Sequence, residues 1–151
     1  MINVVYGDMF EGNDECIVNP VNCKGVSGAG VAKQFKSKFP VAQDTYVRMC
    51  DNGEMVPGFP KIIKSGKELP NSIVLFPTKD HWRDDSRIEW IGNGLYRLSS
   101  IIEDVGITSL GMPMVGAGLG GLDGEKVLEV IRYHLDNDIT INVYQLTKKE
   151  D

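Results

Sequence analysis

The stretch that decides the fold is ITSLGMPMVGAGLGGLDGEKVLEVIRYHL, residues 107–135. Its first part, Ile107–Met112, is a short apolar run typical of a buried strand. Asp123 then occupies the N-cap position of a helix that we expect to reach about Leu135. Between strand and helix lies the glycine-rich segment Gly116-Ala-Gly-Leu-Gly-Gly121. This order is typical of an α/β protein whose backbone N–H groups bind phosphate, although a tight turn with close helix packing needs the same glycines.

The segment matches the pattern GxGxxG, but its place in the chain excludes a Rossmann dinucleotide fold. Only about 30 residues follow Gly121, which leaves room for one more helix and strand but not for a second βαβ half. A P-loop is excluded as well, because no GK[ST] sequence closes the segment. We therefore interpret it as a phosphate-binding loop of another α/β fold.

A second glycine cluster follows an earlier strand. Cys16–Asn19 is a β-rich run that we expect to end at Pro20, and three glycines lie within residues 25–30. Asn19 and Asn22 stand at this expected strand exit. Their amides suit sugar hydroxyls because they both donate and accept, although asparagine is also an ordinary turn residue. The carboxyl ends of parallel strands meet at one edge, so both glycine clusters are expected there.

Strands and helices alternate along the chain with mostly short loops, which predicts one α/β domain over residues 1–151. We expect a mostly parallel sheet with helices on both faces. The exception is a predicted hairpin of Lys61–Lys64 with Ile73–Phe76. The other expected strands are Ile2–Tyr6, Cys16–Asn19, Ile107–Met112 and Ile139–Leu146.

The long helix expected after residue 86 has signals at its start and a weakness in its interior. Ser86 is a plausible N-cap, and Glu89 stands three residues later at the capping-box position. Gly92 and Gly94 lower the helix propensity of the same segment. At the other end of the chain, the tail 146–151 is expected to fray.

The composition excludes several function classes. The 151 residues carry a net charge of −5 and three cysteines. An acidic chain has no general field that attracts nucleic-acid backbones. An odd number of cysteines without CxxC spacing indicates reduced thiols and no zinc site, and no signal peptide or membrane span is recognisable. We therefore expect a cytoplasmic monomer without a metal, a cofactor or a membrane partner.

Six short motifs are spread along nearly the whole chain. They are Gly7-Asp8-Met9, Val18-Asn-Pro-Val-Asn22-Cys-Lys-Gly25, Gly28-Ala-Gly30-Val-Ala, Gly111-Met-Pro113, Val115-Gly-Ala-Gly-Leu-Gly-Gly121 and Val143-Tyr-Gln-Leu146. In this order they resemble the macrodomains, a family that binds ADP-ribose. The resemblance implies a three-layer α/β/α fold with a mixed, mostly parallel sheet of about six strands. It also implies that the partner is ADP-ribose, or a DNA base or protein side chain that carries ADP-ribose.

The resemblance implies a role for each matching segment. Asp8 would bind the adenine amino group beside the Met9 backbone, and Tyr144 would line the adenine pocket. Asn22 and residues 25–30 would surround the distal ribose, and the later glycine loop would wrap the diphosphate. The residues expected to contact ADP-ribose are Asp8, Met9, Asn19, Asn22, Gly25, Gly28, Ala29, Gly30, Val115, Gly116, Ala117, Gly118, Leu119, Gly120, Gly121 and Tyr144.

The segment Phe76-Pro-Thr-Lys79-Asp-His81-Trp-Arg83 is similar to one branch of that family. The branch contains DNA-directed antitoxin glycohydrolases, a glycohydrolase that removes ADP-ribose from glutamate, and ADP-ribose-1″-phosphate phosphatases. The resemblance implies Lys79 and Asn22 as catalytic residues at the C1″ carbon of the ribose. A lysine amine attacks an open-chain sugar aldehyde and forms a Schiff base.

Gly120 departs from the glutamate-directed proteins, which have an aspartate at this position, so a DNA target fits the motif better. His81, Trp82 and Arg83 are candidate contacts to that target, because such side chains stack on a base. Two alternatives stay open. Hydrolysis of ADP-ribose-1″-phosphate would use the same pocket, and a non-catalytic reader of ADP-ribose would need Asp8 and the loops but not Lys79.

Overall fold

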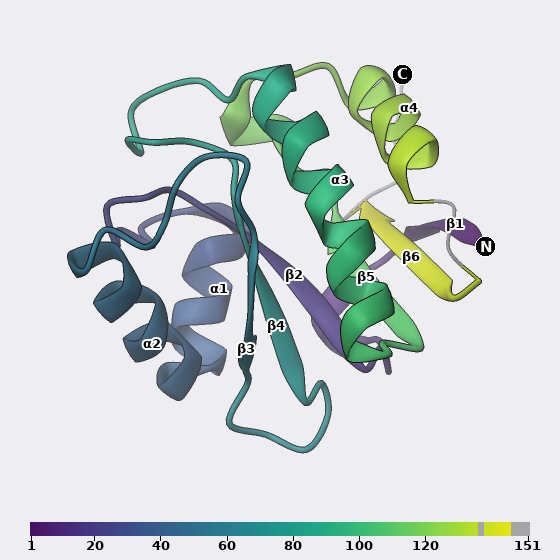
Figure 1. Cartoon of the computed structure of the whole chain (residues 1–151), viewed down its shortest axis with the longest axis horizontal. Helices are drawn as coiled ribbons and strands as arrows, with labels where there is room; N and C mark the ends of the chain where they lie inside the picture. Colours follow the sequence, from purple (N-terminus) through teal and green to yellow (C-terminus); the bar gives the residue numbers. More distant parts are fainter. Residues whose placement is uncertain (136–137, 146–151) are drawn as a thin grey trace.

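The computed structural model describes residues 1–135 and 138–145, and the expected frayed tail 146–151 lies outside them. Helices and strands alternate as predicted (Figure 1). None of the described helices is long and apolar enough to cross a membrane. The elements are β1 (Ile2–Tyr6), η1 (Met9–Glu11), β2 (Cys16–Val21), α1 (Gly30–Lys38), α2 (Pro40–Asp51), β3 (Lys61–Lys64), β4 (Ser72–Pro77), α3 (Ile88–Val105), β5 (Ser109–Pro113), η2 (Gly118–Gly120), α4 (Gly124–His134) and β6 (Thr140–Gln145).

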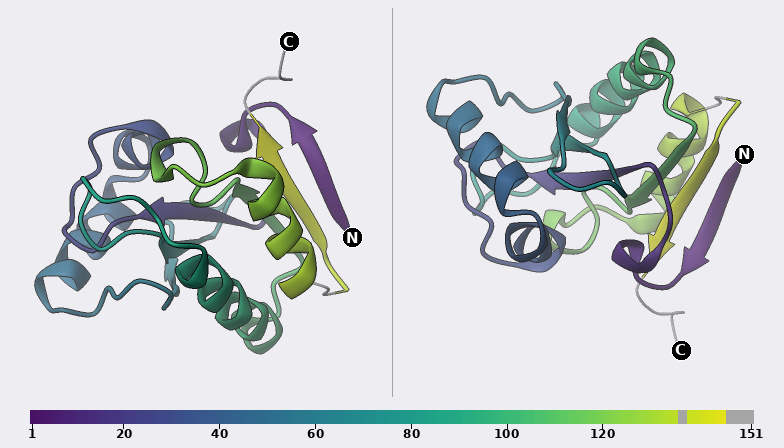
Figure 2. Two further views of the ribbon diagram at one scale, coloured as in Figure 1. Left: turned by 90° about the horizontal axis from the view of Figure 1, so that it is seen from above. Right: turned by 90° about the horizontal axis from the view of Figure 1, so that it is seen from below.

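The strands form a six-stranded sheet in the order β1-β6-β5-β2-β4-β3. Neighbouring strands are parallel except β3, which pairs antiparallel with β4 as the predicted hairpin. Helices α1 and α2 cover one face of the sheet, and α3 and α4 cover the other (Figure 2). The predicted three-layer, mostly parallel fold is therefore confirmed. The loops that follow β1, β2, β4 and β5 all leave the same edge of the sheet.

Apolar side chains fill both spaces between the sheet and its helices. Leu95, Leu98 and Ile131 are fully buried on the α3–α4 side, and Phe35 and Tyr46 are buried on the α1–α2 side. Successive side chains of a strand point to opposite faces, so the central strands contribute to both cores. This explains why they are continuous apolar runs in the sequence instead of alternating polar and apolar residues.

The prediction that β2 ends at Asn19 is wrong, because the strand continues through Pro20 to Val21. Proline normally ends a central strand because it has no N–H donor. Here the ladder between β2 and β5 stops at Ile17 and Gly111, whereas the ladder between β2 and β4 runs on to Val21. At Pro20 one edge of β2 is therefore unpaired, and the missing donor costs little. Because β2 and β5 stop pairing at this point, the carboxyl ends of these two neighbouring parallel strands lie apart.

The capping box predicted at Ser86 is wrong, because α3 begins two residues later with Arg87 as its N-cap. Ser86 is buried, and its N–H donates to the carbonyl oxygen of Gly120 at 2.9 Å. A tertiary contact between two loops thus overrides the local capping pattern. The N-cap prediction for Asp123 is confirmed, since its carboxylate accepts a hydrogen bond from the N–H of Glu125.

Two glycines of α3 have different surroundings, which gives a test of the packing. A Cβ at Gly94 would lie 2.5 Å from the Phe76 ring on β4, whereas a Cβ at Gly92 would have its nearest atom, His134 Nε2, at 3.6 Å. Gly94→Ala is expected to lower the free energy of unfolding by about 1–3 kcal/mol through overpacking. Gly92→Ala is expected to raise it by up to about 1 kcal/mol through helix propensity. Urea denaturation compares the two, and equal effects would contradict the close approach of α3 to β4.

Candidate functional site

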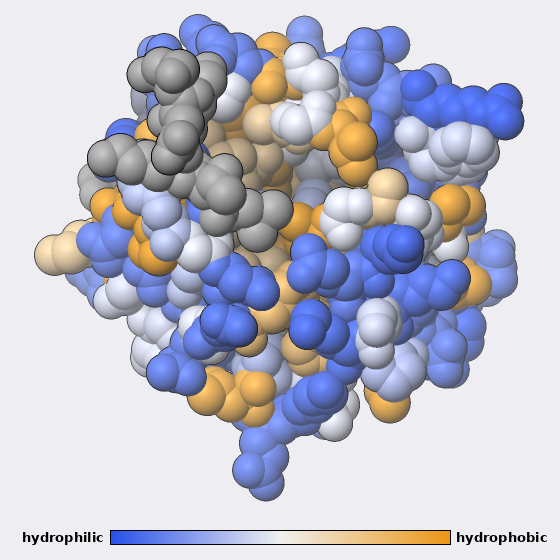
Figure 3. Space-filling view, turned by 180° about the vertical axis from the view of Figure 1, so that it is seen from behind, coloured by the Kyte–Doolittle hydropathy of each residue, from blue (hydrophilic) through white to orange (hydrophobic). Residues whose placement is uncertain are grey.

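A cavity of about 520 Å³ lies at the edge of the sheet where β2 and β5 diverge. Three loops surround it: the first glycine loop (residues 22–29, after β2), the β4–α3 loop (78–87) and the second glycine loop (114–123, after β5). Figure 3 views the molecule from behind and shows a hollow with apolar and weakly polar residues in it. Both glycine clusters therefore lie at the same edge of the sheet, as predicted.

Most of the residues predicted from the sequence share this cavity. Its wall includes Asn22, Gly28, Ala29, Gly30, Lys79, Trp82, Gly116, Ala117, Gly118, Leu119 and Gly120. Asp8, Met9 and Tyr144 line a smaller cavity beside it. Neither cavity is lined by Asn19, Gly25, Val115, Gly121, His81 or Arg83.

Asn19 differs most from its prediction. It lies inside β2 and not at a strand exit, and only 3% of its surface is exposed. Its Oδ1 has no hydrogen-bond partner among the described residues. The contact between Asn19 and a sugar therefore stays a prediction without support from the shape of the cavity.

The backbone of the second glycine loop is open to a ligand. Gly116 has a φ of +82°, and a Cβ there would lie 2.9 Å from both Ile91 and Leu122, so packing and backbone geometry both require glycine. Gly118 has a φ of +62°, and an added Cβ would meet nothing within 4 Å. The space beside Gly118 lets a ligand approach the backbone closely. The N–H groups of Ala117, Gly120, Gly121 and Leu122 donate to carbonyl oxygens of the same segment. An anion such as a diphosphate would therefore depend on the N–H groups of the remaining residues, such as Gly118.

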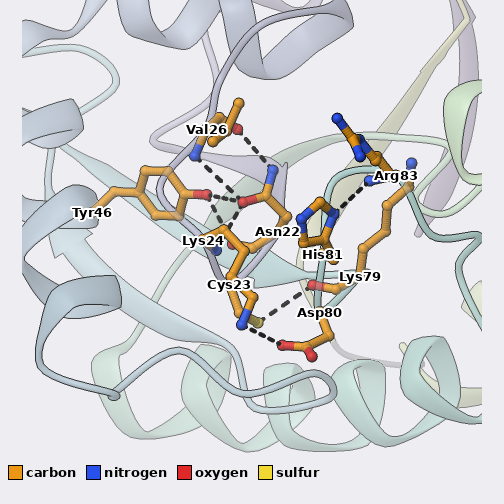
Figure 4. Close-up of polar contacts among 9 residues, drawn as sticks. All are labelled: Asn22, Cys23, Lys24, Val26, Tyr46, Lys79, Asp80, His81 and Arg83. Carbon is orange, nitrogen blue, oxygen red and sulfur yellow. Dashed lines mark hydrogen bonds and ion pairs between the residues drawn. The ribbon is translucent and has the colours of Figure 1, made fainter.

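Lys79 reaches from the β4–α3 loop to the second glycine loop. Its Nζ donates to the carbonyl oxygen of Leu119 at 2.9 Å. The Lys79 carbonyl accepts from Cys23 Sγ at 3.3 Å, and the Asp80 carbonyl accepts from Cys23 N–H at 2.9 Å (Figure 4). Burial raises the pKa of Cys23 to about 12, so its thiol stays a donor. Lys79 is thus held between the two glycine loops, by its backbone carbonyl on one side and by its amine on the other.

Asn22 supports the first glycine loop from inside (Figure 4). Its Oδ1 accepts from Lys24 N–H and from the Tyr46 hydroxyl, each at 2.9 Å, and its Nδ2 donates to the Val26 carbonyl at 2.7 Å. Burial raises the pKa of Tyr46, so the hydroxyl keeps its proton and remains a donor. Tyr46 lies on α2, and nothing in the helical pattern around it distinguished it from an ordinary core residue.

The smaller cavity, of about 30 Å³, adjoins the first one. Asp8 and Tyr144 line it together with Val31 and Pro113, and the last two residues also line the larger cavity. The carboxylate of Asp8 accepts from the N–H of Phe10 and so caps η1. The two cavities therefore form neighbouring parts of one depression, which extends from the end of β1 to the end of β4.

A buried carboxylate fixes Tyr144 in this depression. The Tyr144 hydroxyl and Asn142 Nδ2 both donate to Asp14, each at 2.8 Å. Burial and the hydrogen bond to Asp14 raise the pKa of Tyr144 to about 12. Gly111 leaves room for the carboxylate, because a Cβ there would lie 2.5 Å from Asp14 Oδ2. Asp14 stands in a polar loop without a recognisable motif, so sequence reasoning missed it.

Position 120 has no room for a side chain. A Cβ at Gly120 would lie 2.6 Å from Ser86 Oγ, and Ser86 is buried. The backbone hydrogen bond from Ser86 to Gly120 holds the two residues together. An aspartate at position 120, as the resemblance implies for the glutamate-directed branch, would have to displace Ser86.

The described residues offer no metal site. Within residues 1–135 and 138–145, no three His, Cys, Asp or Glu side chains are grouped so that they could hold a metal ion. The polar residues that line the larger cavity include Asn22, Thr78 and Lys79, beside the glycine loops.

Comparison with known proteins agrees with this geometry. The model of the Macro domain matches residues 18–131. A DNA ADP-ribosyl glycohydrolase of Mycobacterium tuberculosis is 40% identical over 128 residues, which are 84% of this chain and 36% of that protein. The chain thus spans little more than a third of the length of this curated relative.

Solved structures show the same fold. The macrodomain of Mycobacterium tuberculosis DarG has a TM-score of 0.92 and 36% identity, and the match covers 95% of this chain and 97% of that one. Thermosipho africanus DarTG in complex with ADP-ribose has a TM-score of 0.90 and 30% identity, covering 99% of this chain and 43% of that one. The chain belongs to the macrodomain family.

Proposed function

We propose that this chain binds ADP-ribose and hydrolyses the bond that joins ADP-ribose to a modified DNA base. The observation that carries the proposal is the position of Lys79, which lines the cavity and whose amine bonds to the second glycine loop. The curated relative named as a DNA ADP-ribosyl glycohydrolase supports the DNA substrate. The relative solved with ADP-ribose supports the ligand.

The depression offers a place for each part of ADP-ribose. We place adenine on the side of the depression where Asp8 and Tyr144 lie, partly outside the smaller cavity, and the diphosphate against the open backbone around Gly118. The distal ribose then lies between residues 28–30 and the second glycine loop, with its C1″ carbon toward Lys79. The modified base leaves the cavity on the side of the β4–α3 loop.

The reaction uses the amine of Lys79 as a nucleophile. Nζ attacks as the free amine, bonds to C1″ and gives up a proton, while the bond between C1″ and the base breaks and the base leaves with the electron pair and takes up that proton. The sugar opens to a Schiff base, which water hydrolyses to free ADP-ribose and the free amine. Asn22, the second predicted catalytic residue, acts here by holding the loop against which the ribose rests, because its amide bonds to Lys24 and Val26 in that loop and to Tyr46 on α2.

Position 120 favours a DNA target over a glutamate ester. The contact with Ser86 leaves no room for an aspartate at position 120, so this chain lacks the carboxylate that the glutamate-directed branch has at that position. Three substrates assayed in parallel distinguish the possible activities. Turnover of ADP-ribosylated DNA indicates a DNA-directed glycohydrolase, turnover of ADP-ribosylated protein a protein-directed one, and turnover of ADP-ribose-1″-phosphate a phosphatase. Binding without turnover of any of the three would make the chain a reader.

Lys79→Ala and Lys79→Arg test the nucleophile. Both variants are expected to lower kcat on ADP-ribosylated DNA by more than about 100-fold, because arginine keeps the charge but has no free amine. Calorimetry should still show ADP-ribose binding. Borohydride added during turnover should trap a covalent adduct on the wild type and not on Lys79→Arg.

Lys126→Ala is the matched control, because Lys126 is exposed on α4 away from the cavity. It should cleave the substrate and form the adduct as the wild type does. Full turnover by Lys79→Arg would contradict the nucleophilic role and leave only a role for the charge.

Asp8 can be tested with a ligand that differs in one group. The hypoxanthine counterpart of ADP-ribose has a carbonyl in place of the adenine amino group, so the wild type should bind it roughly 10- to 100-fold more weakly. Asp8→Ala should bind both ligands with the same reduced affinity. Asp8→Asn keeps an oxygen acceptor for η1 and controls for loss of local structure. A preference for adenine that survives in Asp8→Ala would contradict the contact.

A further inference from the structure

Trp82 borders the proposed site without being buried in it. It lines the larger cavity together with Thr78 and Lys79, yet 44% of its surface is exposed. It lies three positions after Lys79 in the β4–α3 loop. An aromatic ring in this position offers a large, rigid contact area to whatever is attached to a ligand in the cavity.

The neighbours of Trp82 are also planar. The Arg83 guanidinium carbon lies 4.6 Å from the centroid of the Trp82 ring, and the His81 ring lies 5.1 Å from it at an interplanar angle of 31°. The N–H of Arg83 donates to His81 Nδ1 at 3.1 Å, and both residues stand beside Lys79 in Figure 4. Three planar side chains thus follow one another in the loop that carries Lys79, and of the three Trp82 lines the larger cavity.

Charge does not provide an alternative way to hold DNA at this loop. Its three basic residues are balanced by three acidic ones, and the whole chain has a net charge of −5. Attraction to phosphates is therefore weak, whereas stacking on planar side chains acts on any base and needs no net charge. The basic residues of the loop 78–87 are Lys79, Arg83 and Arg87, and its acidic residues are Asp80, Asp84 and Asp85.

We propose that His81, Trp82 and Arg83 form a stacking platform for the nucleobase that carries ADP-ribose. The inference rests on the proposed function, because C1″ beside Lys79 places the attached base next to this platform. A base in a duplex is stacked on its neighbours and must first be extruded, so the platform favours single-stranded DNA. Since phosphates contribute little, the activity should depend weakly on salt.

Trp82→Ala and Trp82→Phe test the platform on a single-stranded oligonucleotide with one ADP-ribosylated base. Trp82→Ala is expected to lower kcat/KM by about 10- to 100-fold, while Trp82→Phe, which keeps a ring, stays within about fivefold of the wild type. The Kd of free ADP-ribose, measured by calorimetry, should change less than about threefold in either variant, because free ADP-ribose has no base at this position.

Trp90→Phe is the matched control. Trp90 lies on α3, makes a similar contact with Arg87 at 5.0 Å and does not line the larger cavity. This variant should cleave the oligonucleotide at the wild-type rate. Thermal unfolding of all three variants verifies that they are folded.

A second measurement separates the platform from the chemistry. In the Lys79→Ala background, the added Trp82→Ala change should weaken binding of the modified oligonucleotide by about 10-fold or more, but not binding of free ADP-ribose. Equal loss for both ligands, or no loss for either, would overturn the platform. A larger loss on ADP-ribosylated protein than on DNA would assign the platform to a protein target and overturn it as well. If the wild type binds the oligonucleotide but never cleaves it, the proposed function is wrong. The measured affinities then still show whether Trp82 contributes to binding of the modified base.

Discussion

The site depends on the early end of the β2–β5 ladder. The two strands pair only as far as Ile17 and Gly111, while β2 stays paired with β4 to Val21. Pro20 fits this arrangement because a strand edge without a partner needs no donor. The sheet therefore opens between two parallel neighbours, and the loops after both strands face each other across the gap. Without this divergence the glycine loops would leave adjacent strand ends with no cavity between them.

The β4–α3 loop joins the other two loops. At its start, the N–H of Thr78 donates to Val21, and the Asp80 carbonyl accepts from Cys23. At its end, the N–H of Ser86 donates to Gly120 in the second glycine loop. The loop that carries the Lys79 amine is thus attached to both walls of the cavity. This attachment explains how a lysine on a loop, ordinarily a mobile surface charge, is held in one place, as the proposed reaction requires.

Much of the fold could be predicted because it depends on local patterns. Apolar runs and glycine clusters predicted the alternation of strands and helices, and Asp123 was recognised as an N-cap from its position alone. The failures share a cause. Pro20 continues a strand and Ser86 is buried because of contacts with residues far away in sequence, which a local pattern does not contain. Asp14 and Tyr46 were missed for the same reason, since each supports the site from a segment without a motif.

We infer that one depression holds ADP-ribose with its reactive carbon at Lys79. A crystal structure of the protein with ADP-ribose tests it most directly. We expect adenine beside Asp8 and Tyr144, the diphosphate on the N–H groups around Gly118, and C1″ facing Lys79 Nζ. ADP-ribose bound in the reverse direction, or with C1″ turned away from Lys79, would contradict it.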